Sequence, residues 1–577
     1  MTRRPSALAL LTALLLALTA CSIVPTSSPT IPITQAPERP QRDVGIDPLP
    51  PAKGATPEEI VRGFVDAAAS SARGRPVASE YLTADAADSW SDATEISIIS
   101  SDYATVATEG GSVEMTASVI GTVDDRGIFH ARRDVLTHDF TMVEVDGEWR
   151  ISDPPDTLVI LELDFKRLYD RVEAYFLDPT LRELVPDPRF LINGEAQPTV
   201  LVERLIEGPS PTLANGVTNP LQGARLARAV TIEDQTALVD LTGLEVGPDT
   251  PLRELSAQLV WTLAQLDDLR IRSVAISVDG EPLELDDVPV QQTTDDWRAF
   301  DPDAAPLETV GHYLQDGALR TVAGGEPAPG PAGQGEYRLE SAAVAADART
   351  GALTFLAGVR PDPGGATLLA GPYGGVLQPV LSGPTLSAPT ASATRSEVWV
   401  VRDGNEVVLV PSGSSGGPPQ KVSVPSLPGL GRAQLLELSP DGVRVAVVVA
   451  GATGPRLYMG VRSEGEGGVA VRDLIEVAPT LGRVVDVAWR STGQLWVIAG
   501  DPGEERPYSV GVDGWDLTSV GTSGLPVPAT PTSLAAAPGR RPLVVAGGTL
   551  WQWSGARWVT LVRGEEPLPG SAPFYPL

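Results

Sequence analysis

The side chains that most enzymes use for nucleophilic or metal chemistry are scarce in this sequence. Among 577 residues there is one cysteine, Cys21, and there are three histidines, His130, His138 and His312. A disulfide framework needs paired cysteines, and a zinc cluster needs closely spaced cysteine or histidine ligands. The inventory therefore excludes a disulfide scaffold, a thiol redox pair and a zinc cluster. We expect no metal site and no cofactor.

Cys21 stands where a lipoprotein signal places its cysteine. Two arginines near the start are followed by an apolar run over residues 7–17, which ends in Leu18, Thr19, Ala20 and Cys21. The run is shorter than the roughly 20 residues that cross a bilayer, so it is typical of a signal peptide. Its end resembles a bacterial lipobox, in which the cysteine sulfur receives a diacylglycerol through a thioether, cleavage follows the preceding residue and the new amine is acylated.

The lipobox predicts where the protein resides. Two or three acyl chains hold a protein stably on a membrane, whereas one chain binds only marginally. We therefore expect a signal peptide over residues 1–20 and a palmitate-type lipid anchor at Cys21. The mature chain would lie on the extracytoplasmic face of the cell membrane. An ordinary secretory signal with a chance cysteine is the alternative.

Other reactive side chains lack the context that catalysis needs. A Gly-Ser-Ser-Gly-Gly run at residues 413–417 lies in a Pro/Gly/Ser-rich loop, without the strand-to-helix turn of a nucleophile elbow. His130 and His138 fall among expected strands, where a lone histidine is more often a surface or hydrogen-bonded residue than a base. Paired aspartates lie beside turns without EF-hand spacing, so solvation is expected and calcium is a minority alternative. We predict that the protein is not an enzyme. The pairs are Asp124-Asp125, Asp267-Asp268, Asp286-Asp287 and Asp295-Asp296.

The charge is strongly negative and unevenly distributed. The chain has 43 lysines and arginines against 74 aspartates and glutamates, a net charge of −31. So acidic a surface repels phosphate backbones, and no nucleic acid is expected as a partner. Residues 301–577 carry a net charge of −7, which leaves −24 on residues 1–300. The nearly neutral C-terminal half is therefore the better docking surface.

The chain is long enough for about three or four domains, preceded by a tether. Residues 22–55 contain eight prolines in 34 positions, with few large apolar residues. This composition favours extended, polyproline-like stretches. We expect residues 21–55 to form a lipidated tether that lifts the folded body off the membrane, although an inert remnant of signal cleavage would have the same composition.

The first folded domain is predicted over residues 56–155. A capping box at residues 56–59, with proline in the first turn, begins a helix. Alternation over residues 113–119 predicts a strand, and an Asp-Gly turn predicts a hairpin over residues 142–151. A helix followed by such a curved sheet resembles the NTF2-like, cone-shaped α+β folds.

A second α+β domain is predicted over residues 156–300. Its order of elements resembles the GerMN domain of sporulation and germination proteins over residues 171–285, an envelope-associated module without established chemistry. One helix carries leucines at helical spacing on a single face. The elements are a strand at 175–178, the run Leu-Val-Pro-Asp-Pro-Arg at 184–189, a helix at 199–206 ended by Gly-Pro-Ser-Pro, a strand at 237–241, the leucine-bearing helix at 251–266 and a strand at 274–278.

Residues 301–577 contain a repeat of two apolar strands joined by a turn. Successive turn positions lie 44, 47, 51 and 47 residues apart, an interval that fits four short strands and is typical of a β-propeller. We expect about six blades. Phe355, Trp399 and Trp496 recur on the second strand, where a core role between blades is more probable than cofactor stacking. The turn positions are Gly351, Arg395, Gly442, Gly493 and Arg540.

The order of segments resembles that of the LpqB lipoproteins of actinobacteria over nearly the whole chain. This order is lipobox, Pro-rich tether, α+β domain, GerMN domain and propeller. The strongest local matches are the segment from Leu163 to Phe190 and the helix around Gln258–Leu263. The resemblance implies an accessory protein of the Mtr two-component system that contacts the extracytoplasmic domain of the sensor histidine kinase. Through it the family influences the cell envelope, division and drug tolerance.

Two functions of different classes follow. The first is a non-enzymatic signalling adaptor, docked through residues 301–577 rather than 56–300 and only modestly sensitive to salt. The second is an envelope glycan- or peptide-binding propeller, which a hydrolytic activity could accompany, because propellers host both kinds of function. Converging carboxylates or a metal in the central funnel would favour the second function, and apolar or small residues there would favour docking.

Overall fold

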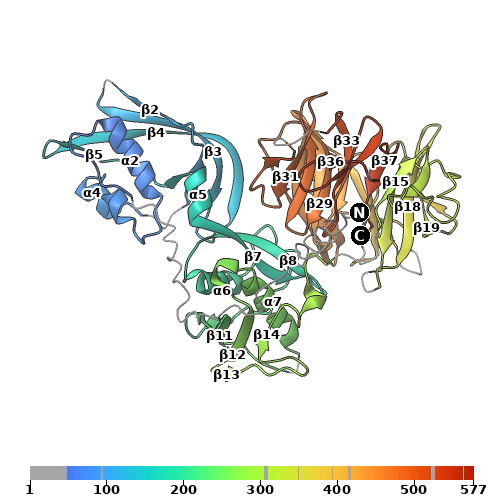
Figure 1. The fold of residues 1–577 in the computed structure, drawn as a ribbon, viewed down its shortest axis with the longest axis horizontal. Helices are drawn as coiled ribbons and strands as arrows, with labels where there is room; N and C mark the ends of the chain where they lie inside the picture. The colour runs from blue at the N-terminus through green and yellow to red at the C-terminus, as the bar shows by residue number, and fades with distance from the viewer. Residues whose placement is uncertain are drawn as a thin grey trace, which may run out of the picture. The chain divides into compact units, whose positions relative to one another are not determined.

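The computed structural model describes residues 48–576 except for 92–94, 109, 248, 305–309, 348–349, 393, 413–416, 522–526 and 563–564. Along the chain it contains a region of helices and strands, a GerMN domain and a large all-β propeller (Figure 1). The fold class expected from the sequence, two α+β domains followed by a propeller, is thus confirmed at this level. The NTF2-like label for the first domain stays a prediction.

Helix α2 (Pro57–Ala68) opens the N-terminal region as its capping box predicts. The backbone N–H of Glu59 donates to Thr56 Oγ1 at 3.3 Å, and the N–H of Thr56 donates to Glu59 Oε2 at 2.8 Å. The helix packs its apolar residues, among them Ile60 and Phe64, against one sheet. Two short helices follow, α3 (Pro76–Ser79) and α4 (Ala84–Ser89).

The N-terminal sheet has the strand order β5-β4-β3-β1-β6, with β2 also paired to β3. The predicted Asp146-Gly147 turn joins β4 to β5, and both residues adopt positive φ. The strands are β1 (Ile96–Ile99), β2 (Ala104–Ala107), β3 (Ser112–Val123), β4 (Phe129–Val145), β5 (Glu148–Ile151) and β6 (Leu158–Leu161).

This sheet extends past residue 155, where the sequence placed the end of the first domain. Strand β6 runs parallel to β1, with Ile160 opposite Ile98, and both side chains are fully buried. Helix α5 (Glu162–Leu168) then packs Phe165 into the same core. Strand β6 pairs with a strand some sixty residues earlier in the chain, and such a pairing leaves no pattern in the local sequence. The hairpin at 142–151 does leave such a pattern, so the sequence suggested that the first domain ends soon after it.

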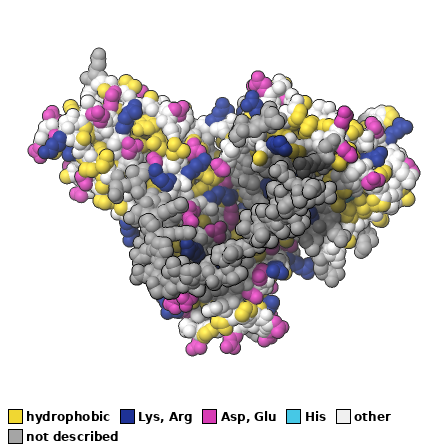
Figure 2. All heavy atoms as spheres, viewed as in Figure 1, with side chains coloured by type: hydrophobic (Ala, Val, Ile, Leu, Met, Phe, Trp, Pro, Cys, Tyr) yellow, Lys and Arg dark blue, Asp and Glu magenta, His cyan; other side chains and the backbone are white. Residues whose placement is uncertain are grey.

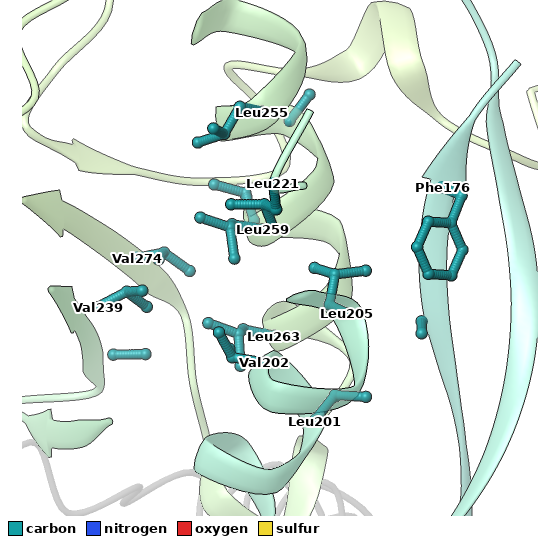
Figure 3. Packing of buried hydrophobic residues seen from close by; sticks show 14 of the residues in the cluster. Phe176, Leu201, Val202, Leu205, Leu221, Val239, Leu255, Leu259, Leu263 and Val274 are labelled. Atoms are coloured by element: carbon teal, nitrogen blue, oxygen red, sulfur yellow. The ribbon is translucent and has the colours of Figure 1, made fainter. Parts of the chain in front are cut away.

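The GerMN domain is built around helix α7 and a mixed sheet. Strands β11 and β12 are parallel, and α7 connects them. Leu255, Leu259 and Leu263 of α7 face Leu201 and Leu205 of α6 in one fully buried cluster (Figure 3). The elements are β7 (Tyr169–Leu177), β8 (Leu184–Ile192), α6 (Gln197–Glu207), β9 (Arg225–Leu226), β10 (Thr231–Glu233), β11 (Thr236–Thr242), α7 (Leu252–Ala264), β12 (Ser273–Val278), β13 (Glu281–Pro282) and β14 (Gln291–Gln292), with 3-10 turns at Asp267–Leu269 and Arg298–Phe300.

The described residues beyond 310 form six antiparallel sheets, five of four strands and one of three. The three-stranded sheet joins β15 (His312–Gln315) and β16 (Ala318–Thr321) to β37 (Ser571–Phe574), so the two ends of the propeller pair with each other and close the ring. The first strands β17, β21, β25, β29, β33 and β37 each contact the next one around the axis.

The four-stranded sheets follow one another along the chain. Every turn position of the predicted repeat falls between the first and second strand of a sheet. Of the three aromatic residues predicted for the core, Trp399 and Trp496 are buried, and Phe355 is partly buried against the core. The sheets are β17 (Ser341–Ala346), β18 (Leu353–Asp362), β19 (Gly365–Pro372) and β20 (Gln378–Gly383); β21 (Thr390–Ser392), β22 (Glu397–Arg402), β23 (Glu406–Pro411) and β24 (Gln420–Val422); β25 (Arg432–Leu438), β26 (Arg444–Gly451), β27 (Gly454–Gly465) and β28 (Gly468–Glu476); β29 (Val484–Ser491), β30 (Gln494–Ala499), β31 (Arg506–Gly511) and β32 (Thr518–Ser519); and β33 (Pro531–Ala535), β34 (Leu543–Ala546), β35 (Thr549–Trp553) and β36 (Trp558–Val559), with α8 (Leu427–Leu430) before β25.

Candidate functional site

The residues predicted to carry the lipid anchor, Leu18, Thr19, Ala20 and Cys21, lie outside the described residues, as do residues 413–416 of the Gly/Ser loop. Within the described part of the chain, no helix is long and apolar enough to cross a membrane. Two places in the described chain are considered for a site. One is the propeller axis, and the other is the junction between the GerMN domain and the propeller.

The three histidines lie in separate environments. His130 Nε2 lies 3.4 Å from Asp124 Oδ2, and His138 Nε2 lies 3.0 Å from the carbonyl oxygen of Asp153. His312 is fully buried with its Nε2 2.8 Å from the Tyr373 hydroxyl, and burial lowers the pKa of this histidine to about 4. Nowhere in the described ranges do three or more His, Cys, Asp or Glu side chains gather in a way that could hold a metal ion.

Two carboxylic acids lie on the first strands that surround the propeller axis, Glu437 on β25 and Asp486 on β29. Each bonds to a neighbouring blade. Thr390 of β21 donates its hydroxyl to Glu437 Oε2 at 2.9 Å, and the N–H of Leu534 in β33 donates to Asp486 Oδ2 at 2.8 Å. The acids therefore act as cross-links between blades.

The protonation of these acids fits that structural role. Burial raises the pKa of Glu437 to about 8 and that of Asp486 to about 7, and the proximity of Asp486 adds to the rise at Glu437. A protonated acid is a poor cation ligand, and one oxygen of each side chain already accepts a hydrogen bond from the adjacent blade. The remaining first strands contribute mostly small residues, such as the Ala342–Ala346 run of β17.

The junction begins with the β7–β8 hairpin of the GerMN domain, which contacts turns between first and second propeller strands. Arg395 Nη2 lies 3.0 Å from Asp178 Oδ2, and their side chains are only 10% and 2% exposed. Arg444 Nη2 donates to the carbonyl oxygen of Pro186 at 2.5 Å. At Gly216 a Cβ atom would collide with propeller valines, so glycine permits the close approach.

Buried acids surround these arginines. Burial, together with the charges of Asp178 and Asp441, raises the pKa of Glu183 to about 7. Asp178 itself accepts three backbone N–H bonds and the Thr180 hydroxyl, which hold its pKa below the ordinary value in spite of burial. The junction is thus a desolvated polar interface whose charge depends on pH.

A second contact region lies around the turn between β31 and β32. Trp515 of this turn packs against Phe129, Phe165 and Phe190 of the preceding domains, with ring centroids 5.0 to 5.4 Å apart. Lys166 Nζ lies 3.2 Å from Asp516 Oδ1 and above the Trp515 ring. Sequence reasoning missed Trp515; the available signal was a large aromatic residue inside a Gly/Asp-rich turn, where it can bury only against another domain.

Acidic side chains gather at the end of the GerMN domain that carries β13, whereas the visible propeller surface mixes both signs (Figure 2). The exposed acids at that end include Glu281, Glu284, Asp286 and Asp287. This distribution agrees with the uneven division of charge along the sequence.

Comparisons with known proteins match successive parts of the chain to three family models. Residues 50–166 match the model described as the N-terminal domain of lipoprotein LpqB, and residues 317–576 match the LpqB β-propeller domain. Residues 173–284 match the Germane model, described as sporulation and spore germination.

Curated relatives match over most of their length. The chain is 32% identical to lipoprotein LpqB of Mycolicibacterium smegmatis over 80% of this chain and 82% of that protein. It is 30% identical to lipoprotein LpqB of Cutibacterium acnes over 93% of each chain, and 31% identical to that of Mycobacterium tuberculosis over 87% of this chain and 88% of the relative.

Proposed function

The chain belongs to the LpqB lipoprotein family, and from that premise we propose that it is a lipid-anchored, non-enzymatic accessory protein on the extracytoplasmic face of the cell membrane. In this role it modulates the Mtr sensor histidine kinase and thereby cell-envelope homeostasis and division. The observation that carries the proposal is the coincidence of family membership with a lipobox at the only cysteine of the chain.

The hydrogen bonds of the two acids at the propeller axis, Glu437 and Asp486, favour the adaptor role over a glycan- or peptide-binding propeller. Glu437 and Asp486 are the converging carboxylates that chemistry would need, but hydrogen bonds from adjacent blades engage both. A scaffold whose axial acids bond to the adjacent blades in this way presents its loops for recognition.

The propeller has one face available for a partner. Turns between first and second strands contact the GerMN domain through Arg395, Arg444 and Gly493. In an antiparallel meander the turns between second and third strands lie on the opposite face, and we name residues 403–405, 451–454 and 500–505 the far face. Thr453 and Asp501 on this face are exposed. We assign the kinase contact to the far face.

The partner is best identified from the membrane of the native organism. Lipidated full-length protein is captured from detergent-solubilised membranes, and co-purifying proteins are identified by mass spectrometry. The proposal expects a sensor kinase with an extracytoplasmic domain to be enriched over a capture with the unlipidated Cys21→Ser chain. Repeated absence of any such kinase, with the bait shown to be lipidated, would argue against the adaptor role.

A further inference from the structure

Strand β4 leaves one edge of the N-terminal sheet open over several residues. Residues 129–141 of β4 pair with β3, whereas on its other side β5 covers only residues 142–145. Within the part of the chain that the structure describes, no strand pairs with that other side over residues 133–139. A register shift between β3 and β4 next to residue 133 ends the regular stretch. The open stretch is as long as a typical whole strand of about 5–6 residues.

The backbone groups at the open edge can be assigned residue by residue. The N–H of Ser152 donates to the carbonyl oxygen of Thr141 at 2.9 Å, so Thr141 faces the side of β4 on which β5 lies. Because this direction alternates along a strand, Asp139, Thr137 and Val135 face the same side. Among the described residues none of these three has a backbone hydrogen bond on that side, and Val135 is 65% exposed. Their N–H and C=O groups are therefore available to an added strand.

The side chains along this edge carry opposite charges at its two ends. Arg132 and Arg133 stand at one end, and Asp139 stands at the other, with Glu114 of β3 directly opposite it. All four side chains are exposed, and none forms an ion pair with another described residue. Like charges directly opposite each other on neighbouring strands are destabilising, so the acidic end favours an approaching cation.

A second copy of the same edge supplies that cation when it approaches antiparallel. If two β4 strands pair about Leu136, Arg133 of each copy stands opposite Asp139 of the other, and Val135 stands opposite Thr137. The charges then attract at both ends of the pairing. A parallel copy in the same register would instead place arginine beside arginine and acid beside acid. The order of charges along the edge is therefore complementary to itself in the antiparallel direction, as a two-fold interface requires.

We propose that the open edge of β4, residues 133–139, pairs antiparallel with the same edge of a second copy of this chain. The two N-terminal sheets would then join into one continuous sheet, with the N–H of Thr137 in each copy donating to the carbonyl oxygen of Val135 in the other. This inference does not depend on the kinase contact, which is assigned to the far face of the propeller.

Sedimentation equilibrium of the mature chain tests the pairing. The chain is produced without residues 1–20 and with Cys21→Ser, so that acyl chains do not gather it into micelles. Concentrations reach about 200 µM, because so short an interface binds weakly. We expect the wild-type sequence of β4 to give a monomer–dimer equilibrium.

Charge reversals test the predicted register. Arg133→Asp and Asp139→Arg should each raise the dissociation constant of the dimer at least tenfold, because each sets like charges opposite each other. The double variant Arg133→Asp/Asp139→Arg brings opposite charges together again and should regain most of the affinity. Asp286→Arg makes the same change as Asp139→Arg on an exposed turn of the GerMN domain, and it should leave the dimer unchanged.

Thr137→Pro tests the backbone contact. The N–H of Thr137 points away from β3, so proline removes an outward donor and leaves the bonds between β3 and β4 in place. The variant should be monomeric with a nearly unchanged melting temperature; if it fails to fold, the charge reversals decide. A monomeric wild type over the whole concentration range would overturn the proposal. So would a dimer that survives the single reversals, or a double variant that stays monomeric.

Discussion

At the residue scale, the proposed membrane attachment rests on the sulfur atom of Cys21. Serine offers no thiolate for acyl transfer, so Cys21→Ser should stay unlipidated, with its signal uncleaved by the lipoprotein peptidase. Metabolic labelling with a palmitate analogue should mark the wild type and a Ser22→Ala control but leave Cys21→Ser unmarked. A labelled Cys21→Ser chain would show that the lipobox interpretation is wrong.

Glu437 makes a residue-scale prediction about pH. Burial raises its pKa to about 8 from the ordinary value of 4.5, so the folded state holds this proton more tightly than the unfolded state. The stabilising contribution is complete below the unfolded pKa and is lost as pH rises through about 8. Melting temperature should therefore fall between about pH 5 and about pH 9.

Glu437→Gln isolates this effect. The glutamine can still accept the Thr390 hydroxyl but cannot ionise, so the variant should lose part of the alkaline destabilisation. The remainder should persist because Asp486, with its pKa raised to about 7, titrates in the same direction. An identical pH profile for wild type and variant would mean that Glu437 does not carry the proton.

At the element scale, the hairpin β7–β8 and the propeller turns depend on buried ion pairs. Arg395→Ala would leave Asp178 buried without its cation, a change that costs about 3–5 kcal/mol for such pairs. The matched control is Arg298→Ala, because its pair with Asp295 is 78% and 76% exposed and such pairs contribute about 0–1 kcal/mol. Chemical denaturation should separate the two variants; equal losses would contradict the structural role of the junction.

The elements of the fold differ in how far the sequence alone could predict them. The local sequence was sufficient to predict helix α2, because Thr56 and Glu59 form their capping box within one turn. It was also sufficient to predict the strand pairs of the propeller, because each turn and the two strands that it joins are contiguous in the chain. The closure of β37 onto β15 and the pairing of β6 with β1 join distant segments, which no local period encodes.

The candidate sites were harder to foresee for the same reason. Asp178 and Arg395 look like ordinary turn residues of two different domains, and only the folded chain brings them within 3.0 Å. Glu437 stands in a largely apolar strand, and nothing in its local sequence indicates a bond to Thr390 of the adjacent blade. The prediction of lipidation at Cys21 needs no knowledge of the fold, because a lipobox consists of neighbouring residues.

At the scale of the whole molecule, stability should need neither metal nor disulfide. The described chain buries an apolar core in each domain, at roughly 25 cal/mol for each Å² removed from water, and no metal-ligating group of three side chains is found within it. Addition of EDTA should leave the melting temperature unchanged. A fall of many degrees that calcium restores would point to a carboxylate-bound ion.

The domains also have to be tested together. A fragment of residues 301–577 alone would expose the side chains of Arg395, Arg444 and Trp515, which are buried against the preceding domains in the full chain. A loss of kinase binding by such a fragment could then come from partial unfolding as well as from a lost docking surface. Surface variants of the full chain avoid this problem. Asp501→Arg changes the far face, and Asp286→Arg makes the same change on an exposed turn of the GerMN domain.

The central claim is that a sensor kinase docks on the far face of the propeller, and a titration of the full mature chain against the kinase's extracytoplasmic domain tests it most directly. We expect Asp501→Arg or Thr453→Trp to weaken binding at least tenfold and Asp286→Arg to leave it unchanged. Affinity should fall only modestly from about 50 to about 300 mM salt, since few charged pairs carry the contact. Undiminished binding by both far-face variants, or a steep loss with salt, would contradict the account.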